Sequence, residues 1–92
     1  MTADVPPHAR PALSPGYRFQ WEAAQDAYVL LYPEGMVTLN ESAAEVLRRC
    51  DGERTVQGVI DDLQAAFPGA ELDEDVKEFL AQARERGWIR VE

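Results

Sequence analysis

Two residues of this chain could supply nucleophilic chemistry: a single cysteine, Cys50, and a single histidine, His8. Nucleophilic catalysis needs the nucleophile within hydrogen-bond reach of a base. Cys50 shares a helical stripe with Val46 and Leu47, which is typical of a small buried hydrophobe, whereas His8 lies in a proline-rich stretch. We therefore expect no catalytic pair, and a lone cysteine can close no internal disulfide.

Carboxylates are the next candidates, because clustered acids could bind a hard cation. Asp61 and Asp62 are adjacent, and a further acidic run spans residues 71–78. Neighbouring positions of a helix point about 100° apart, so an adjacent pair does not converge on one ion. The sequence has no EF-hand spacing, no phosphate-binding glycine motif, and no H-E-x-x-H or C-x-x-C motif. We expect a solvated acidic face, no metal, no cofactor and no enzymatic activity.

The charge balance limits the partners. The chain has 92 residues, with 17 acidic and 9 basic side chains and a formal net charge of −8. Phosphate backbones are repelled by such a chain unless its cations gather on one face. An alternative function is a winged-helix DNA-binding or transcriptional module, but the helix expected at 55–67 carries no Lys or Arg to enter a groove. We expect no nucleic-acid partner.

The first 15 residues hold four of the six prolines and are expected to form a flexible arm, followed by a single domain over residues 16–92. The start of the chain lacks the apolar stretch of a signal peptide, and its longest apolar run, 27–32, is far shorter than a membrane span. We therefore expect a cytoplasmic protein without a membrane partner.

The elements that must position any site follow from periodicity. Residues 17–22 alternate aromatic and polar side chains, residues 27–32 are apolar on both faces, and residues 36–39 follow a Pro-Glu-Gly turn. The period then changes to 3.6, which predicts helices over 40–50, 55–67 and 73–86, with residues 88–89 folding back onto the core. The predicted fold is α+β and winged-helix-like: a three-stranded antiparallel β-meander followed by three α-helices.

The third strand is the predicted recognition surface. In a meander the first and third strands are edges with unpaired backbone groups, and the first strand carries charges that discourage pairing. The third strand is uncharged and consists of Met36, Val37, Thr38 and Leu39. Proline at Val37 is expected to block this edge and to spare the fold.

The third helix is the expected wall of a groove beside that edge. Its candidate contacts are Val76, Leu80 and Ala83 for apolar groups, and Lys77 and Arg84 for acidic groups. The alternative is that the three apolar residues simply complete the core, and residue patterns alone favour this alternative.

Several segments together resemble one known family. They are Y-R-F-Q-W-E at 17–22, Y-V-L-L-Y-P-E-G-M at 28–36, L-N-E-S-A at 39–43, R-C-D-G at 49–52 and G-W-I at 87–89. The chain is similar over these segments to the pyrroloquinoline quinone (PQQ) biosynthesis protein family PqqD. The likeness extends over nearly the whole chain from Pro11 to Ile89.

The resemblance implies a recognition element for a ribosomally made, post-translationally modified peptide. Such a domain captures the precursor peptide PqqA as an added strand between the third strand and the third helix. It then delivers the peptide to the radical S-adenosylmethionine enzyme PqqE. The resemblance therefore favours a peptide-binding role for Val76, Leu80 and Ala83 over a purely structural role in the core. It does not decide between a monomer and a homodimer.

Overall fold

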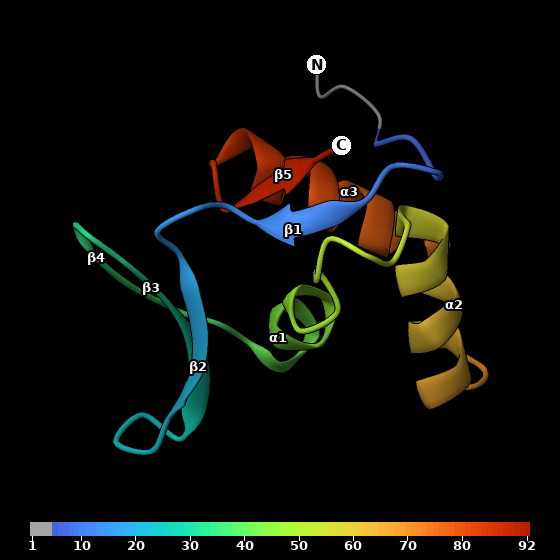
Figure 1. Ribbon diagram of the computed structural model, residues 1–92. Coiled ribbons are helices and arrows are strands. Elements are labelled where there is room, and N and C mark those ends of the chain that lie inside the picture. Colours follow the sequence, from blue (N-terminus) through green and yellow to red (C-terminus); the bar gives the residue numbers. More distant parts are fainter. Residues whose placement is uncertain (1–4) are drawn as a thin grey trace.

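A small sheet followed by three helices forms the main body of the protein (Figure 1). The computed structural model describes residues 5–92. The sheet is antiparallel in the order β2-β3-β4, which confirms the predicted fold class. The elements of this body are β2 (Arg18–Glu22), β3 (Ala27–Tyr32), β4 (Gly35–Thr38), α1 (Glu41–Leu47), α2 (Val56–Ala66) and α3 (Asp73–Glu85). In the view of Figure 1, α1 lies between the sheet and α2.

The helices begin where side-chain caps satisfy their first N–H groups. The Asn40 side chain accepts a hydrogen bond from the N–H of Ala43 at 2.8 Å, and Thr55 Oγ1 accepts one from the N–H of Gly58 at 3.0 Å. Asn40, where the first helix was predicted to begin, is therefore the cap of α1. The helix ends at Leu47, earlier than predicted, because the N–H of Cys50 bonds to the Leu47 carbonyl three residues back and tightens the last turn.

A second sheet corrects the prediction of a flexible arm over residues 5–15. β1 (Pro11–Leu13) pairs antiparallel with β5 (Ile89–Val91), and the backbones of Arg10 and Glu92 exchange bonds of 2.7 and 3.2 Å beside this pair. Val5 and Ala9 are buried, with 4% and 5% of their surface exposed. Proline lacks an N–H but keeps its carbonyl, and the carbonyls of Pro7 and Pro11 accept bonds from the N–H groups of Gln57 and Gly52. Residues 1–4 lie outside the described residues.

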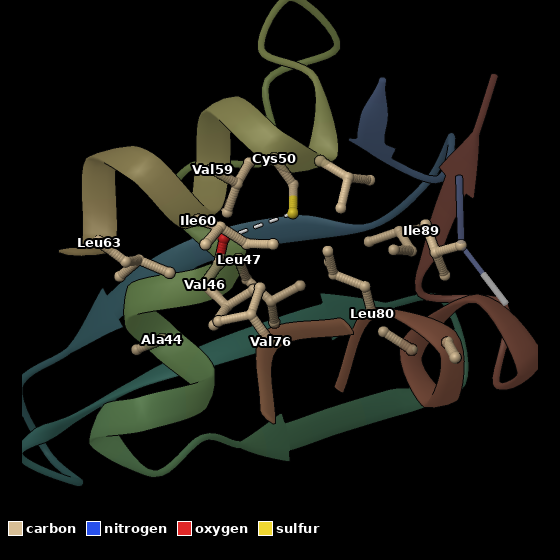
Figure 2. Close-up of a cluster of buried hydrophobic side chains, with 14 of the residues drawn as sticks. Ala44, Val46, Leu47, Cys50, Val59, Ile60, Leu63, Val76, Leu80 and Ile89 are labelled. Atoms are coloured by element: carbon tan, nitrogen blue, oxygen red, sulfur yellow. Dashed lines mark hydrogen bonds between the residues drawn. The ribbon is translucent and has the colours of Figure 1, made fainter. Parts of the chain in front are cut away.

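One hydrophobic core joins all three helices to β3 (Figure 2). Val46 and Leu47 from α1 face Ile60 from α2 and Leu80 from α3, and Leu30 closes the core from the sheet. Among residues 5–92, no helix has the length and apolar character needed to cross a membrane. The core therefore holds the sheet against the helices.

Candidate peptide-binding site

The edge formed by β4 is open within the part of the chain that the structure describes. β4 pairs with β3 from Tyr32↔Gly35 to Val29↔Thr38, and no described strand lies on its other side. Its four residues include no charge and no proline, so the usual features that protect an edge from pairing are missing there. The prediction that this strand is an uncharged edge agrees with the structure.

The hydrogen-bond phase of β4 identifies the residues that can accept a new strand. The N–H of Leu39 donates to the Tyr28 carbonyl at 2.9 Å. In an antiparallel ladder, successive residues point their N–H and C=O groups alternately toward and away from the partner strand. Val37 therefore points these groups at β3, whereas Met36 and Thr38 point theirs outward. Met36 and Thr38 supply the free backbone groups of this edge.

This phase corrects the expectation for proline at Val37. The Val37 N–H faces Leu30 in the β3–β4 ladder, and its side chain is half-buried against the core. Proline there would remove an internal hydrogen bond and destabilise the sheet. Thr38 is the position where proline removes only an outward donor, because proline is tolerated on edge strands where the N–H faces solvent.

The side chains of the predicted edge residues differ in exposure. Met36 is 40% exposed, and Thr38 is also exposed, with its Oγ1 donating to Gln25 Oε1 at 2.9 Å. Leu39 is only 6% exposed and belongs to the core. A peptide on this edge would therefore meet the Met36 side chain and the backbone of β4, but not the Leu39 side chain.

The three apolar residues predicted on the α3 wall lie inside the protein. Val76, Leu80 and Ala83 are 3%, 0% and 0% exposed and belong to the core cluster (Figure 2). They complete the core, as the alternative held, and offer no exposed apolar surface beside β4. Leu80 and Ala83 could contact a peptide only if α3 moved, whereas Val76 also lines a cavity beyond the end of β4.

Three other residues of α3 are partly accessible. Phe79 is half-buried and packs against the core, and Lys77 and Arg84 are half-buried as well. Lys77 Nζ lies 3.0 Å from Asp73 Oδ1, one helical turn earlier. The role proposed for Lys77 and Arg84 toward acidic groups of a peptide stays a prediction.

A cavity of about 540 Å³ opens just beyond the end of β4. It lies between the start of α1, the end of α2 and the start of α3, and its apolar lining consists of Ala43, Val46, Leu63, Phe67, Ala70, Leu72, Val76 and Phe79. Phe67, the last residue of the helix predicted over 55–67, is 45% exposed and lines this cavity. Sequence reasoning missed the cavity because periodicity predicts which faces turn inward and not where three helix ends fail to meet.

Cys50, the cysteine considered above for catalysis, is part of the hydrophobic core. Cys50 is 5% exposed and its thiol points at the Val46 carbonyl, 3.4 Å away. Burial, with a smaller effect of the Asp51 charge, raises the pKa of the Cys50 thiol to about 12, so the reactive thiolate is scarce near neutral pH.

The acidic residues of α2 do not form a cation site. Asp62 lies 2.5 Å from Nε of Arg49, and this bond lowers the pKa of the Asp62 carboxyl below its usual value. The same guanidinium contacts Glu45 at 2.8 Å and so ties α1 to α2. Within residues 5–92, no group of three or more His, Cys, Asp or Glu side chains is placed to hold a metal ion.

The fold and the site together define a small winged-helix-like recognition domain. It has an open sheet edge, an apolar cavity next to that edge, and no catalytic constellation in its described part. The sequence model of the family described as coenzyme PQQ synthesis protein D (PqqD) matches residues 27–89. This chain belongs to that family, which confirms the resemblance seen in its sequence.

Similar proteins cover nearly all of the chain. It is 55% identical over 83 residues to the PqqA binding protein of Acinetobacter baylyi, covering 89% of this chain and 84% of that protein. It is 56% identical over 82 residues to the PqqA binding protein of Stutzerimonas stutzeri, covering 88% and 89% of the two chains.

A solved structure shares the fold. It is the solution NMR structure of the PqqD truncation of Methylobacterium extorquens PqqCD, described as a functional and stand-alone recognition element for ribosomally synthesized and post-translationally modified peptides. The TM-score is 0.77 at 26% identity, and the match covers 97% of this chain and 96% of that one.

Proposed function

We propose that this protein is a non-catalytic peptide chaperone of PQQ cofactor biosynthesis that binds the precursor peptide PqqA as an added strand on β4. The names of its relatives support the choice of peptide. The observation that carries the mode of binding is the open edge of β4, where Met36 and Thr38 direct their N–H and C=O groups away from the sheet. Strand addition to such an edge is a recurrent mode of peptide recognition.

Backbone pairing alone cannot hold the peptide. Each hydrogen bond contributes about 0.5–1.5 kcal/mol net, so a few bonds at Met36 and Thr38 add only a few kcal/mol. Association itself costs roughly 4–15 kcal/mol. The peptide must therefore also place side chains into apolar contacts, either beside Met36 or farther along the surface.

The second part of the proposal is that the bound peptide is presented to the radical S-adenosylmethionine enzyme PqqE. The resemblance to PqqD is the basis of this step. It suits a chain whose only cysteine is buried, because the enzyme and not this domain would supply the cysteines of an iron–sulfur cluster. The peptide would stay anchored on β4 while its remaining length reaches the enzyme.

A titration of ¹⁵N-labelled protein with synthetic PqqA tests the binding mode. We expect the amide resonances of Met36 and Thr38 to shift on binding and their hydrogen exchange to slow, because both N–H groups become bonded. The Phe19 and Trp21 amides on the opposite β2 edge serve as internal controls. Saturable binding that leaves Met36 and Thr38 unchanged would show that strand addition on β4 is wrong.

Light scattering tests the assembly. We expect either a monomer, or a homodimer that pairs two β4 edges and dissociates when PqqA is added. Adding PqqE to the protein–peptide complex should give a larger complex containing all three chains. Separate elution of PqqE at micromolar concentrations would contradict the presentation step.

A further inference from the structure

The cavity beyond β4 has an acidic mouth as well as an apolar lining. Glu41, Glu45 and Asp75 line it together with the apolar residues, and within the described chain no Lys, Arg or His lines it. Glu45 already pairs with Arg49 on the side of α1 that faces α2. An apolar floor with a rim of one charge sign suits a ligand that has an apolar side chain and a group of the opposite charge.

The position of the cavity connects it to the proposed strand site. Its lining begins at Asn40, two residues after Thr38, the last residue of β4. An extended peptide advances about 3.3 Å per residue, so a strand paired with β4 comes within reach of the cavity after about two to five further residues. Val46, Leu63 and Val76 line the cavity from α1, α2 and α3.

We propose that this cavity is a second anchoring point for the same peptide. It binds one bulky apolar or aromatic side chain that lies next to a Lys or Arg and about two to five residues outside the segment paired with β4. This inference rests on the proposed strand addition. The cavity supplies the side-chain contact that the backbone bonds require, and the acidic rim selects peptides that carry positive charge at this point.

Substitutions can narrow the cavity and reverse a charge at its rim without changing any fully buried core residue. Ala43→Leu adds a larger side chain to a half-buried lining residue of α1, and Ala65→Leu is its control on the exposed surface of α2. Asp75→Lys reverses a rim charge. Glu74→Lys makes the same change of charge in the same helical turn, but Glu74 does not line the cavity. Circular dichroism melts check that all four variants fold.

The affinity for PqqA is then measured for each variant. We expect Ala43→Leu to weaken binding about tenfold, as loss of a buried apolar anchor does. Asp75→Lys should weaken binding about threefold at low salt, with a smaller effect at high salt. The two control variants should bind as the parent protein does.

A scan of the peptide identifies the anchor. PqqA variants with single apolar residues changed to Ser, or single Lys or Arg residues changed to Gln, are measured against the parent protein and Ala43→Leu. One apolar position and its basic neighbour should matter for the parent and lose most of their effect in Ala43→Leu. The inference would be overturned if each peptide substitution weakened binding by the same factor in the parent protein and in Ala43→Leu. It would also be overturned if no peptide position mattered in this way.

Amide shifts separate failure of the cavity from failure of the strand site. If the amides of Met36 and Thr38 shift but those of Ala43 and Phe79 do not, the second anchor is wrong and strand addition on β4 is still supported. Shifts at Ala43 and Phe79 alone overturn strand addition and with it the two-point arrangement. If Ala43→Leu binds PqqA normally but loses PqqE, the cavity serves the enzyme and the inference is wrong.

Discussion

Proline at Thr38 is the sharpest test of the β4 edge. The Thr38 N–H points away from β3, so Thr38→Pro deletes no bond of the β3–β4 ladder. It removes one donor from the edge and places a ring where an added strand would lie. Thr38→Ala is the matched control, because both variants lose the Oγ1 bond to Gln25 and only the proline loses the N–H.

The magnitude follows from the groups removed. One lost hydrogen bond together with the steric block should cost about 1–3 kcal/mol of binding free energy, which weakens PqqA binding by about 5- to 150-fold. Thr38→Ala should stay within about threefold of the parent protein, because the missing bond lies on the exposed surface. Both variants should melt within a few degrees of each other.

Isothermal titration calorimetry with synthetic PqqA measures the affinities, and circular dichroism measures the melting temperatures. Val37→Pro provides the contrast: it should lower stability by about 1–3 kcal/mol, because its N–H belongs to the ladder. Equal affinities for Thr38→Pro and Thr38→Ala would refute either the outward direction of the Thr38 N–H or the use of this edge by the peptide.

Further outcomes are expected at four places in the chain. Leu80→Ala should lower the free energy of unfolding in urea by about 2–5 kcal/mol, since Leu80 is 0% exposed; unchanged stability with lost peptide affinity would instead place Leu80 in the groove. Removal of residues 5–13 should lower the melting temperature because it deletes β1, and an unchanged melt would mean that these residues are a dispensable arm. Cys50 should react with iodoacetamide at pH 8 far faster in urea than in the native protein. The pKa of the Cys50 thiol is about 12 in the folded protein and 9.0 in the unfolded chain. The protonated thiol should therefore contribute fully to stability below pH 9, and this contribution should be lost as the pH rises toward 12. A Cys50→Ala variant should lack this loss, and equal pH dependence of the two proteins would contradict it. The pKa of Asp62 is lower in the folded protein than its unfolded value of 3.8, so its contribution to stability should be present above pH 3.8 and be lost as the pH falls through the lower folded value. The free energy of unfolding, followed from pH 5 to pH 2, should depend less steeply on pH for Asp62→Asn than for the parent protein. An equal slope for the two proteins would argue against the bond to Arg49.

Much of the fold could be predicted because its signals are short-range. The Asn40 and Thr55 caps accept bonds from N–H groups three residues away, so the cap and its helix appear together in a short stretch of sequence. Gly87 ends α3 with a φ of +80°, a conformation that glycine adopts readily. The order of the strands in the main sheet follows from two tight turns along the chain.

β1 was missed because its partner is at the other end of the chain. The stretch around Pro11 looks like an arm by composition, and only its pairing with Ile89–Val91 makes it a strand. The proline carbonyl accepts a bond from the N–H of Gly52, a contact between residues about forty positions apart that no local pattern contains. The composition of a segment shows that its prolines lack N–H donors. It does not show which distant N–H groups bond to the proline carbonyls.

The candidate site divides in the same way. The sequence by itself determined that β4 is uncharged, that it ends the meander and is therefore an edge, and that Val76, Leu80 and Ala83 share one face of a helix. Only the tertiary structure decided that this face is core and not groove, that Met36 and Thr38 carry the outward backbone groups, and that a cavity with acidic residues at its mouth lies beyond β4. The physical reason is that the pattern of side chains along an element is a local property, whereas burial and cavities depend on how separate elements pack.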